Sequence, residues 1–203
     1  SPEPGHHGAG VPPACHEPPG SLSVAERRAG LVADRTRTIN RLHQQLIAIC
    51  PALERVAELS SDRGWVVLLA RYQRPKAIRQ SGVSRLTKTL SDEGVRNAST
   101  IATAAVSAAK AQTVKLPGEE VAATLVAELA QGVIALDDRI KTTDANIEGR
   151  FRRHRLAEVI TSMPGIGFRL GAEFLAAVGD PTLIDSADQL AAWAGLAPVS
   201  RDS

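Results

Sequence analysis

Hydrophobic residues recur every three or four positions along most of this chain, the spacing that places them on one face of an α-helix. Ser23 can cap such a helix together with Glu26, and the apolar residues that follow predict a helix over 24–49. Pro51 ends this helix and opens another, which the pattern predicts over 52–59. The amino-terminal part of the chain is therefore predicted to be helical.

The next region is divided by proline and glycine. An apolar run at 65–72 fits a strand or a helix, because its length does not decide between them. Two short helices are predicted over 75–79 and 84–90, with a turn at Gly82 between them. Residues 99–115 are rich in alanine and predict a helix with a smooth surface on which another helix can lie close.

The clearest periodicity in the chain is a heptad seam that follows a Pro-Gly pair. Its a positions are β-branched and its d positions are mostly leucine, a choice that favours a two-stranded coil in parallel dimers. The seam consists of Val126, Leu129, Val133, Leu136, Ile140, Thr143 and Ile147. It predicts a homodimer, although an antiparallel hairpin with the Ala-rich helix of the same chain would explain the pattern equally well.

A second helix pair, with a glycine turn between its members, lies closer to the carboxy terminus. Pro164 stops a helix over 156–162, and Gly165 and Gly167 permit a tight turn with unusual dihedral angles around Ile166. The amides of this turn and the positive amino terminus of the next helix, where Arg169 lies, would face a phosphate. This helix-hairpin-helix pattern predicts binding to the DNA backbone without reading of sequence. A turn that only packs two helices together is the alternative.

Charge is distributed unevenly, although the formal net charge is only +2. Basic residues crowd the stretch 63–96, and a second basic patch consists of Arg150, Arg152, Arg153 and Arg155. Acidic residues concentrate between these two regions, over 119–148. We therefore expect binding surface and solvated surface to be segregated, whereas the alternative is that these are ordinary charged helix faces.

Composition limits the fold and its chemistry. Aromatic residues make up only 3% of the chain against 43% hydrophobic residues, so the core must be built from small aliphatic side chains of closely packed helices. The predicted fold class is all-α: helical bundle pieces, a long coiled-coil-like helix and a carboxy-terminal helix-hairpin-helix. We expect a disordered tail over 1–22, a helical region with basic clusters over 23–116, the coiled-coil helix over 117–152 and the hairpin domain over 153–203.

Several classes of function have no support in the sequence. Cys15 and Cys50 lie too far apart in different contexts to suggest a disulfide framework, which indicates a reducing cytoplasm. No apolar run approaches the roughly 18 residues that span a bilayer, so no membrane contact is expected. A nucleophile elbow, a zinc signature and a P-loop are also missing. Asp34, Asp62 and Asp92 lie on or between predicted helices and form no cluster of carboxylates, so we expect no metal or cofactor here.

Several runs of this sequence resemble one known family. The Met163–Gly167 run, Gly179-Asp180-Pro181, Ser186-Ala187 and the run 192–198 are similar to the carboxy-terminal domain of the IS110 insertion-sequence transposases, also called bridge recombinases. The run 32–42 resembles the region just after their amino-terminal RuvC-like domain. Together these runs fall within residues 24–203, and the distal ones are the more specific.

The resemblance implies an enzyme that cuts and rejoins DNA, with four acidic residues in the RuvC-like domain and an attacking serine in the carboxy-terminal domain. Ser203 matches that serine by position, and Ser200 is the fallback. The family also implies Mg²⁺ for the full enzyme, a coiled-coil dimer, and DNA and a structured guide RNA as partners. Because the sequence begins after the acidic residues and ends within the serine motif, we expect a truncated, DNA-binding fragment with no catalysis of its own. The alternative is a non-catalytic helical adaptor or regulator that uses the coiled coil for protein partners.

Overall fold

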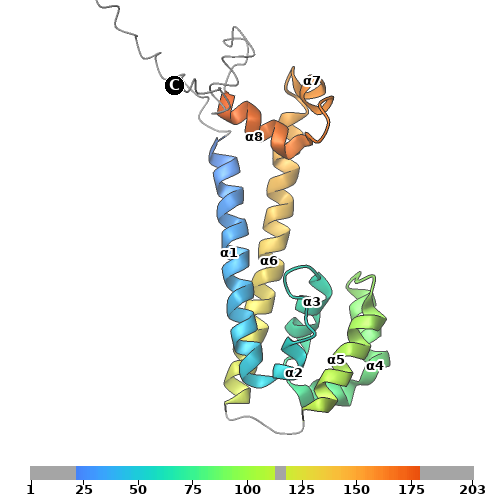
Figure 1. Ribbon diagram of the computed structural model, residues 1–203. Coiled ribbons are helices and arrows are strands. Elements are labelled where there is room, and N and C mark those ends of the chain that lie inside the picture. Colours follow the sequence, from blue (N-terminus) through green and yellow to red (C-terminus); the bar gives the residue numbers. More distant parts are fainter. Residues whose placement is uncertain (1–21, 113–117, 179–203) are drawn as a thin grey trace, which may run out of the picture. The chain divides into compact units, whose positions relative to one another are not determined.

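The computed structural model describes residues 22–112 and 118–178, and this described part contains only helices (Figure 1). The all-α prediction is therefore confirmed. The helices in chain order are α1 (Leu22–Ile49), α2 (Pro51–Glu54), α3 (Arg63–Arg71), α4 (Pro75–Asp92), α5 (Ala98–Ala111), α6 (Glu119–Phe151), α7 (Ala157–Thr161) and α8 (Phe168–Val178). None of the described helices is long and apolar enough to cross a membrane.

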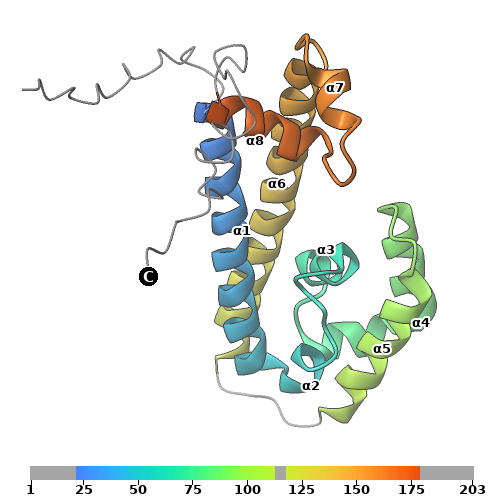
Figure 2. The same ribbon diagram turned by 45° about the horizontal axis from the view of Figure 1, so that its top comes forward.

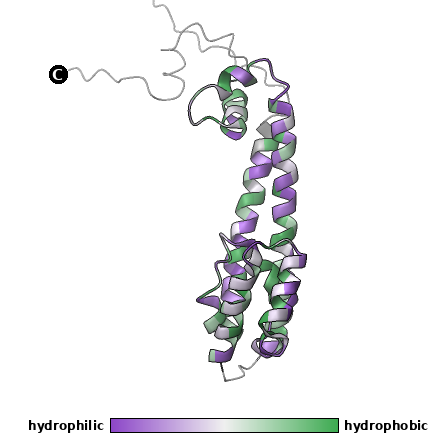
Figure 3. Cartoon of the chain, turned by 90° about the vertical axis from the view of Figure 1, so that its right-hand side faces the viewer, coloured by the Kyte–Doolittle hydropathy of each residue, from purple (hydrophilic) through white to green (hydrophobic). Residues whose placement is uncertain are grey.

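The chain forms two compact units. The central unit is Glu26–Asn146, and the terminal unit combines the residues on either side of it, Ser1–Ala25 and Ile147–Ser203. Within the central unit, α1 and α6 lie side by side and run in opposite directions (Figures 1 and 2). In Figure 3, hydrophobic and hydrophilic residues are mixed along the long helices, as expected for helices that bury one face.

Two ion pairs join α1 to α6 in the central unit. Arg28 Nε lies 2.5 Å from Asp144 Oδ1, and Arg35 Nε lies 2.5 Å from Asp137 Oδ1. The antiparallel direction follows, because the earlier residue of α1 pairs with the later residue of α6. Within one chain, α6 therefore pairs with α1. The alternative that we considered, a hairpin of α6 with the Ala-rich helix, is wrong.

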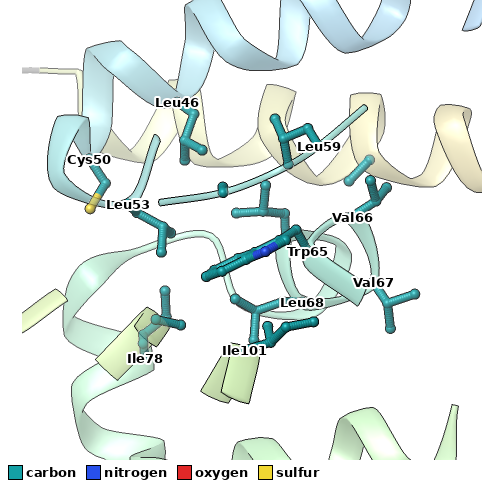
Figure 4. Close-up of a cluster of buried hydrophobic side chains, with 14 of the residues drawn as sticks. Leu46, Cys50, Leu53, Leu59, Trp65, Val66, Val67, Leu68, Ile78 and Ile101 are labelled. Carbon is teal, nitrogen blue, oxygen red and sulfur yellow. The ribbon is translucent and has the colours of Figure 1, made fainter. Parts of the chain in front are cut away.

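α3 settles the open assignment of residues 65–72: residues 65–71 lie in this helix, and Tyr72 follows its end in an extended conformation. Asp62 caps it, because its Oδ1 accepts a hydrogen bond from the Gly64 amide at 2.8 Å, and its Oδ2 accepts another from Asn97 Nδ2 at 2.6 Å. All residues from 64 to 69 are buried. Nearly every face of α3 packs against the core. The sequence of this run therefore shows no helical alternation of apolar and polar residues. Figure 4 shows the Trp65 ring among the side chains of Leu53, Leu59 and Leu68.

The segment before α3 corrects one predicted boundary. α2 begins at Pro51 as expected but ends at Glu54, so the helix predicted over 52–59 is wrong in its second half. Ala57 and Leu59 are buried in the core although they lie outside the helix. Burial of these two side chains, rather than helical propensity, therefore decides where the chain turns.

α4 and α5 pack against each other along their lengths. The turn predicted at Gly82 is present, since this residue has φ 68° and ψ 169° and interrupts α4. Arg79 Nη1 donates hydrogen bonds to the carbonyl oxygens of Ala109, at 2.5 Å, and Gln112, at 2.8 Å. Gln112 Nε2 in turn donates to the Ile49 carbonyl at 2.6 Å. These contacts close the carboxy-terminal end of α5 and tie it to the end of α1.

Cys50 lies in the same core, between α1 and α2. It is a free cysteine with no exposed surface. Burial raises the pKa of its thiol above the ordinary value of 9.0. The Cys50 thiol therefore stays protonated at neutral pH, which fits a packing role.

Candidate nucleic-acid interface

The terminal unit holds a small apolar core of its own. Phe151 at the end of α6 packs with Ala157 and Ile160 of α7, and all three are buried. The partly buried side chains around them come from the turn and from α8, and include Ile166, Phe168, Ala172, Phe174 and Leu175. This core fixes α7, the turn and α8 against the last residue of α6.

A glycine permits the close approach of α8 to this core. A Cβ added at Gly171 would lie 2.6 Å from Phe151 Cζ and 2.9 Å from Ile160 Cγ2. Real Cβ atoms do not come this near to other atoms, so only glycine fits here without a shift. We did not single out this residue from the sequence, although a glycine inside an amphipathic helix is the signal for such a close approach.

The turn between α7 and α8 is short and exposed. The Met163 amide donates to the Ile160 carbonyl at 3.2 Å, and the Ile166 amide donates to the Met163 carbonyl at the same distance. Gly165 has φ 83°, the left-handed conformation that favours glycine. Gly167 is not among the described glycines with a positive φ, so only Gly165 of the two adopts the left-handed conformation.

Gly167 offers open space instead. A Cβ added there would meet no atom within 4 Å, and the residue immediately precedes α8. The first amides of an α-helix have no partner within that helix, and they carry its partial positive charge. The first turn of α8 contains no acidic residue. An anion could therefore approach this end of α8 without steric or electrostatic hindrance from the turn. Ile166, in contrast, packs against the terminal core and anchors the turn.

The predicted basic residues lie in the same unit as the turn. Arg150, Arg152, Arg153 and Arg155 are all exposed at the end of α6 and in the segment that leads to α7. Arg152 pairs with Glu148, with 2.5 Å between Nη2 and Oε1. Arg169 is exposed, and its guanidinium carbon lies 5.6 Å from the centre of the Phe168 ring. The terminal unit therefore carries these arginines at exposed positions, and Arg152 is paired with Glu148.

Comparison with known proteins identifies the family. The model of the IS116/IS110/IS902 transposase family matches residues 157–203, which include α7, the turn and α8. The 44.8 kDa protein of insertion element IS116 from Streptomyces clavuligerus is 52% identical over 180 residues, which cover 89% of this chain and 45% of that protein. The chain belongs to this transposase family.

Two further relatives agree with this placement. The 42 kDa protein of IS900 from Mycobacterium paratuberculosis is 51% identical over 181 residues, 89% of this chain and 45% of that protein. The 43.6 kDa protein of IS110 from Streptomyces coelicolor is 37% identical over 174 residues, 85% of this chain and 43% of that protein. The chain thus spans less than half the length of these relatives. No solved structure matches it.

In this member of the transposase family, much of the predicted dimer seam lies within the central unit. Val126 and Val133 have no exposed surface, and Leu129 packs partly against the same core. Leu136 and Ile140 are half-buried in the same helix, and Ile147 is half-buried in the terminal unit. The homodimer stays a prediction, but Val126 and Val133 are already occupied by contacts within one chain.

The acidic run is not the separate solvated surface that we expected. Asp137 and Asp144 pair with α1, and Asp138 Oδ1 lies 3.7 Å from Arg63 Nη1, so acidic and basic regions meet inside the central unit. A signal in the sequence could have shown this. Arg28 and Arg35 are seven residues apart, and so are Asp137 and Asp144, which is the spacing of one helix face.

The expected catalytic residues lie elsewhere. Ser203 and its fallback Ser200 fall outside the described residues, as do the family-like runs after residue 178. Within the described part, no three acidic, histidine or cysteine side chains gather in one place. The Mg²⁺ expected for the full family enzyme stays a prediction.

Proposed function

We propose that this chain is a DNA-binding part of an insertion-element transposase, and that α7, the turn and α8 hold duplex DNA by its phosphate backbone. The observation that carries the proposal is the open space at Gly167, directly before the amino terminus of α8. A phosphate oxygen at this position would accept hydrogen bonds from backbone amides. The left-handed Gly165 supports the proposal, because it lets the chain turn sharply without a side chain in the way.

Contacts of this type would hold DNA without selecting its sequence. Backbone amides and exposed arginines contact phosphate, which is the same at every base pair. Arg153 and Arg169 are exposed in the same unit and could add charge-assisted contacts to neighbouring phosphates. We therefore expect similar affinities for unrelated duplex sequences, with a strong dependence on salt.

Gly167→Ala tests the proposed contact with little risk to the fold. The residue has no left-handed φ, and its Cβ would meet no protein atom within 4 Å. The methyl group would instead occupy the space proposed for the phosphate. We expect duplex affinity to fall about tenfold, the equivalent of one charge-assisted hydrogen bond of roughly 1.5 kcal/mol. Fluorescence anisotropy with a labelled duplex measures this change.

Gly149→Ala is the matched control. Gly149 lies near the end of α6 in the same unit, and a Cβ there also meets nothing within 4 Å. It should leave duplex affinity unchanged. Equal affinities for wild type, Gly167→Ala and Gly149→Ala, with intact circular dichroism, would rule out a phosphate contact at this turn.

The alternative of a non-catalytic helical adaptor finds less support. It needs the α6 seam for protein partners, whereas Val126 and Val133 are buried inside one chain. The other family expectations belong to the whole protein: strand cleavage by a serine, Mg²⁺, a structured guide RNA and a homodimer. Absence of binding to duplex DNA, branched DNA and structured RNA at low salt would favour the adaptor.

A further inference from the structure

Residues 63–112 of the central unit carry a second concentration of positive charge, and none of these residues takes part in the proposed contact. Residues 63–112 contain nine lysine and arginine residues but only two acidic ones, Asp92 and Glu93. α6, in contrast, carries seven acidic residues and three basic ones over Glu119–Phe151. The excess of positive charge is therefore local to α3, α4 and α5.

Three of these nine cations have structural roles. Arg63 lies 3.7 Å from Asp138, Arg71 Nη2 lies 2.6 Å from Glu93 Oε1, and Arg79 donates to the carbonyl groups at the end of α5. The other six are exposed and form no ion pair with any described residue. They are Arg74, Lys76, Arg85, Lys88, Arg96 and Lys110, which lie on α4, on α5 or next to them, and we call this set the α4–α5 cationic surface.

Packing of the helices explains why these cations face solvent. α4 buries Ile78, Leu86 and Leu90. α5 buries Ile101, Ala102, Ala105, Val106 and Ala109, among others. Arg85 and Lys88 are three residues apart beyond the Gly82 kink, so they share one exposed side of α4. Like charges held this close repel each other, so this arrangement is better suited to binding a polyanion than to stabilising the fold.

The surroundings of the surface indicate which polyanion fits. Trp65 is buried, and Tyr72 is half-buried with its hydroxyl 3.3 Å from Thr89 Oγ1. These are the only aromatic residues in 63–112, so the region offers no platform on which single-stranded bases could stack. Val83 is its only large hydrophobic residue classed as exposed, which gives no apolar face to insert into a membrane. A duplex backbone is the partner that remains.

We propose that the α4–α5 cationic surface binds the phosphate backbone of duplex DNA, as a second contact of the same chain. This inference rests on the proposed function, which supplies DNA rather than RNA as the duplex. DNA held by one site of a chain is present at high effective concentration for any other cationic surface of that chain. The exposed hydroxyls of Ser99 and Ser107 on α5 are further groups that can contact phosphate.

The test compares two charge variants of the full chain on a mixed-sequence DNA duplex across a salt series. The first is Lys76→Gln/Arg85→Gln/Lys88→Gln. The control is Arg27→Gln/Arg41→Gln/Arg55→Gln, which removes the same charge from exposed positions outside the surface. Each lost phosphate contact lowers the slope of log affinity against log salt by about 0.9. A fourfold rise in salt should then weaken the wild type about 40-fold more than the first variant, while the control follows the wild type.

Equal salt slopes for the two variants would overturn the inference. So would a first variant that loses affinity for an RNA duplex while its affinity for DNA is unchanged. Gly167→Ala separates this inference from the proposed function. If only Gly167→Ala weakens DNA binding, the contact at α8 stands and the second surface fails. If only the triple variant on α4 weakens it, the second surface stands and the contact at α8 fails.

Discussion

Four glycines within 23 residues of the terminal unit have different physical roles. Gly165 adopts a positive φ, Gly171 lies against Phe151, and Gly149 and Gly167 have open space where a Cβ would be. A substitution by alanine therefore has a different meaning at each position. At Gly171 it tests packing, at Gly167 it tests ligand approach, and at Gly149 it tests neither.

Gly171→Ala should destabilise the terminal unit. The new methyl group would overlap the Phe151 ring and Ile160, and overpacking of this kind costs about 1–3 kcal/mol. Hydrogen exchange of the α7 and α8 amides measures it, with protection expected to fall by about 5- to 150-fold. Gly149→Ala should be neutral or stabilising by about 0.5–1 kcal/mol, since it removes a glycine from a helix. Unchanged protection in Gly171→Ala would contradict the packing of α8 described here.

At the scale of elements, periodic segments were predictable and buried ones were not. The helix over 24–49 was predicted because one of its faces is polar, which makes the helical period visible. α3 showed no such period because core surrounds it, so the sequence left strand and helix open. α2 was predicted too long because nothing local distinguishes Ala57 and Leu59, which are buried outside the helix.

The heptad seam alone did not identify the partner of α6. A heptad seam shows that a helix packs on another helix, but it does not say which one. The matching seven-residue spacing of two arginines in α1 and two aspartates in α6 carried that information. In the candidate site, Gly165 has the positive φ that a glycine in a tight turn permits, whereas the role of this turn in binding stays a prediction.

Val133→Ala distinguishes packing within one chain from packing between two chains. Val133 is fully buried in the central unit, and the loss of two methyl groups should lower the free energy of unfolding by about 2 kcal/mol. Since the contacts belong to one chain, this loss should be independent of protein concentration. Urea unfolding at several concentrations measures it. A loss that grows on dilution, with a change in solution mass, would place Val133 in a dimer interface instead.

Asp144→Asn tests the pairing of α1 with α6. The Asp144 and Arg28 side chains are only 12% and 23% exposed, so removal of the carboxylate leaves a largely buried guanidinium without its charged partner. We expect a loss of about 1.5–3 kcal/mol in the free energy of unfolding, the value of a hydrogen bond to a charged group. Asp138→Asn is the control, because that side chain is 62% exposed and its loss should cost under about 1 kcal/mol. Equal losses of unfolding free energy in the two variants, measured by thermal unfolding, would contradict the ion pair between α1 and α6.

At the scale of the whole molecule, the net charge does not show how positive and negative residues are distributed. A net charge of +2 is ordinary, yet the cations of the α4–α5 surface and of the terminal unit are exposed, while several acidic residues of α6 pair internally with arginine. Positive charge is therefore concentrated locally, on residues 63–112 and again on residues 150–155, which the net value does not show. This is the arrangement that a sequence-tolerant, backbone-binding protein needs.

The most direct test of the account is the affinity of the unmodified chain for two DNA duplexes of unrelated sequence, measured across a salt series. We expect both duplexes to bind with affinities within about threefold of each other, and both affinities to fall steeply with salt, because the contacts release counterions from phosphates. Failure to bind either duplex at low salt, or an affinity that does not change with salt, would contradict the central claim that this chain of the transposase family binds the DNA backbone.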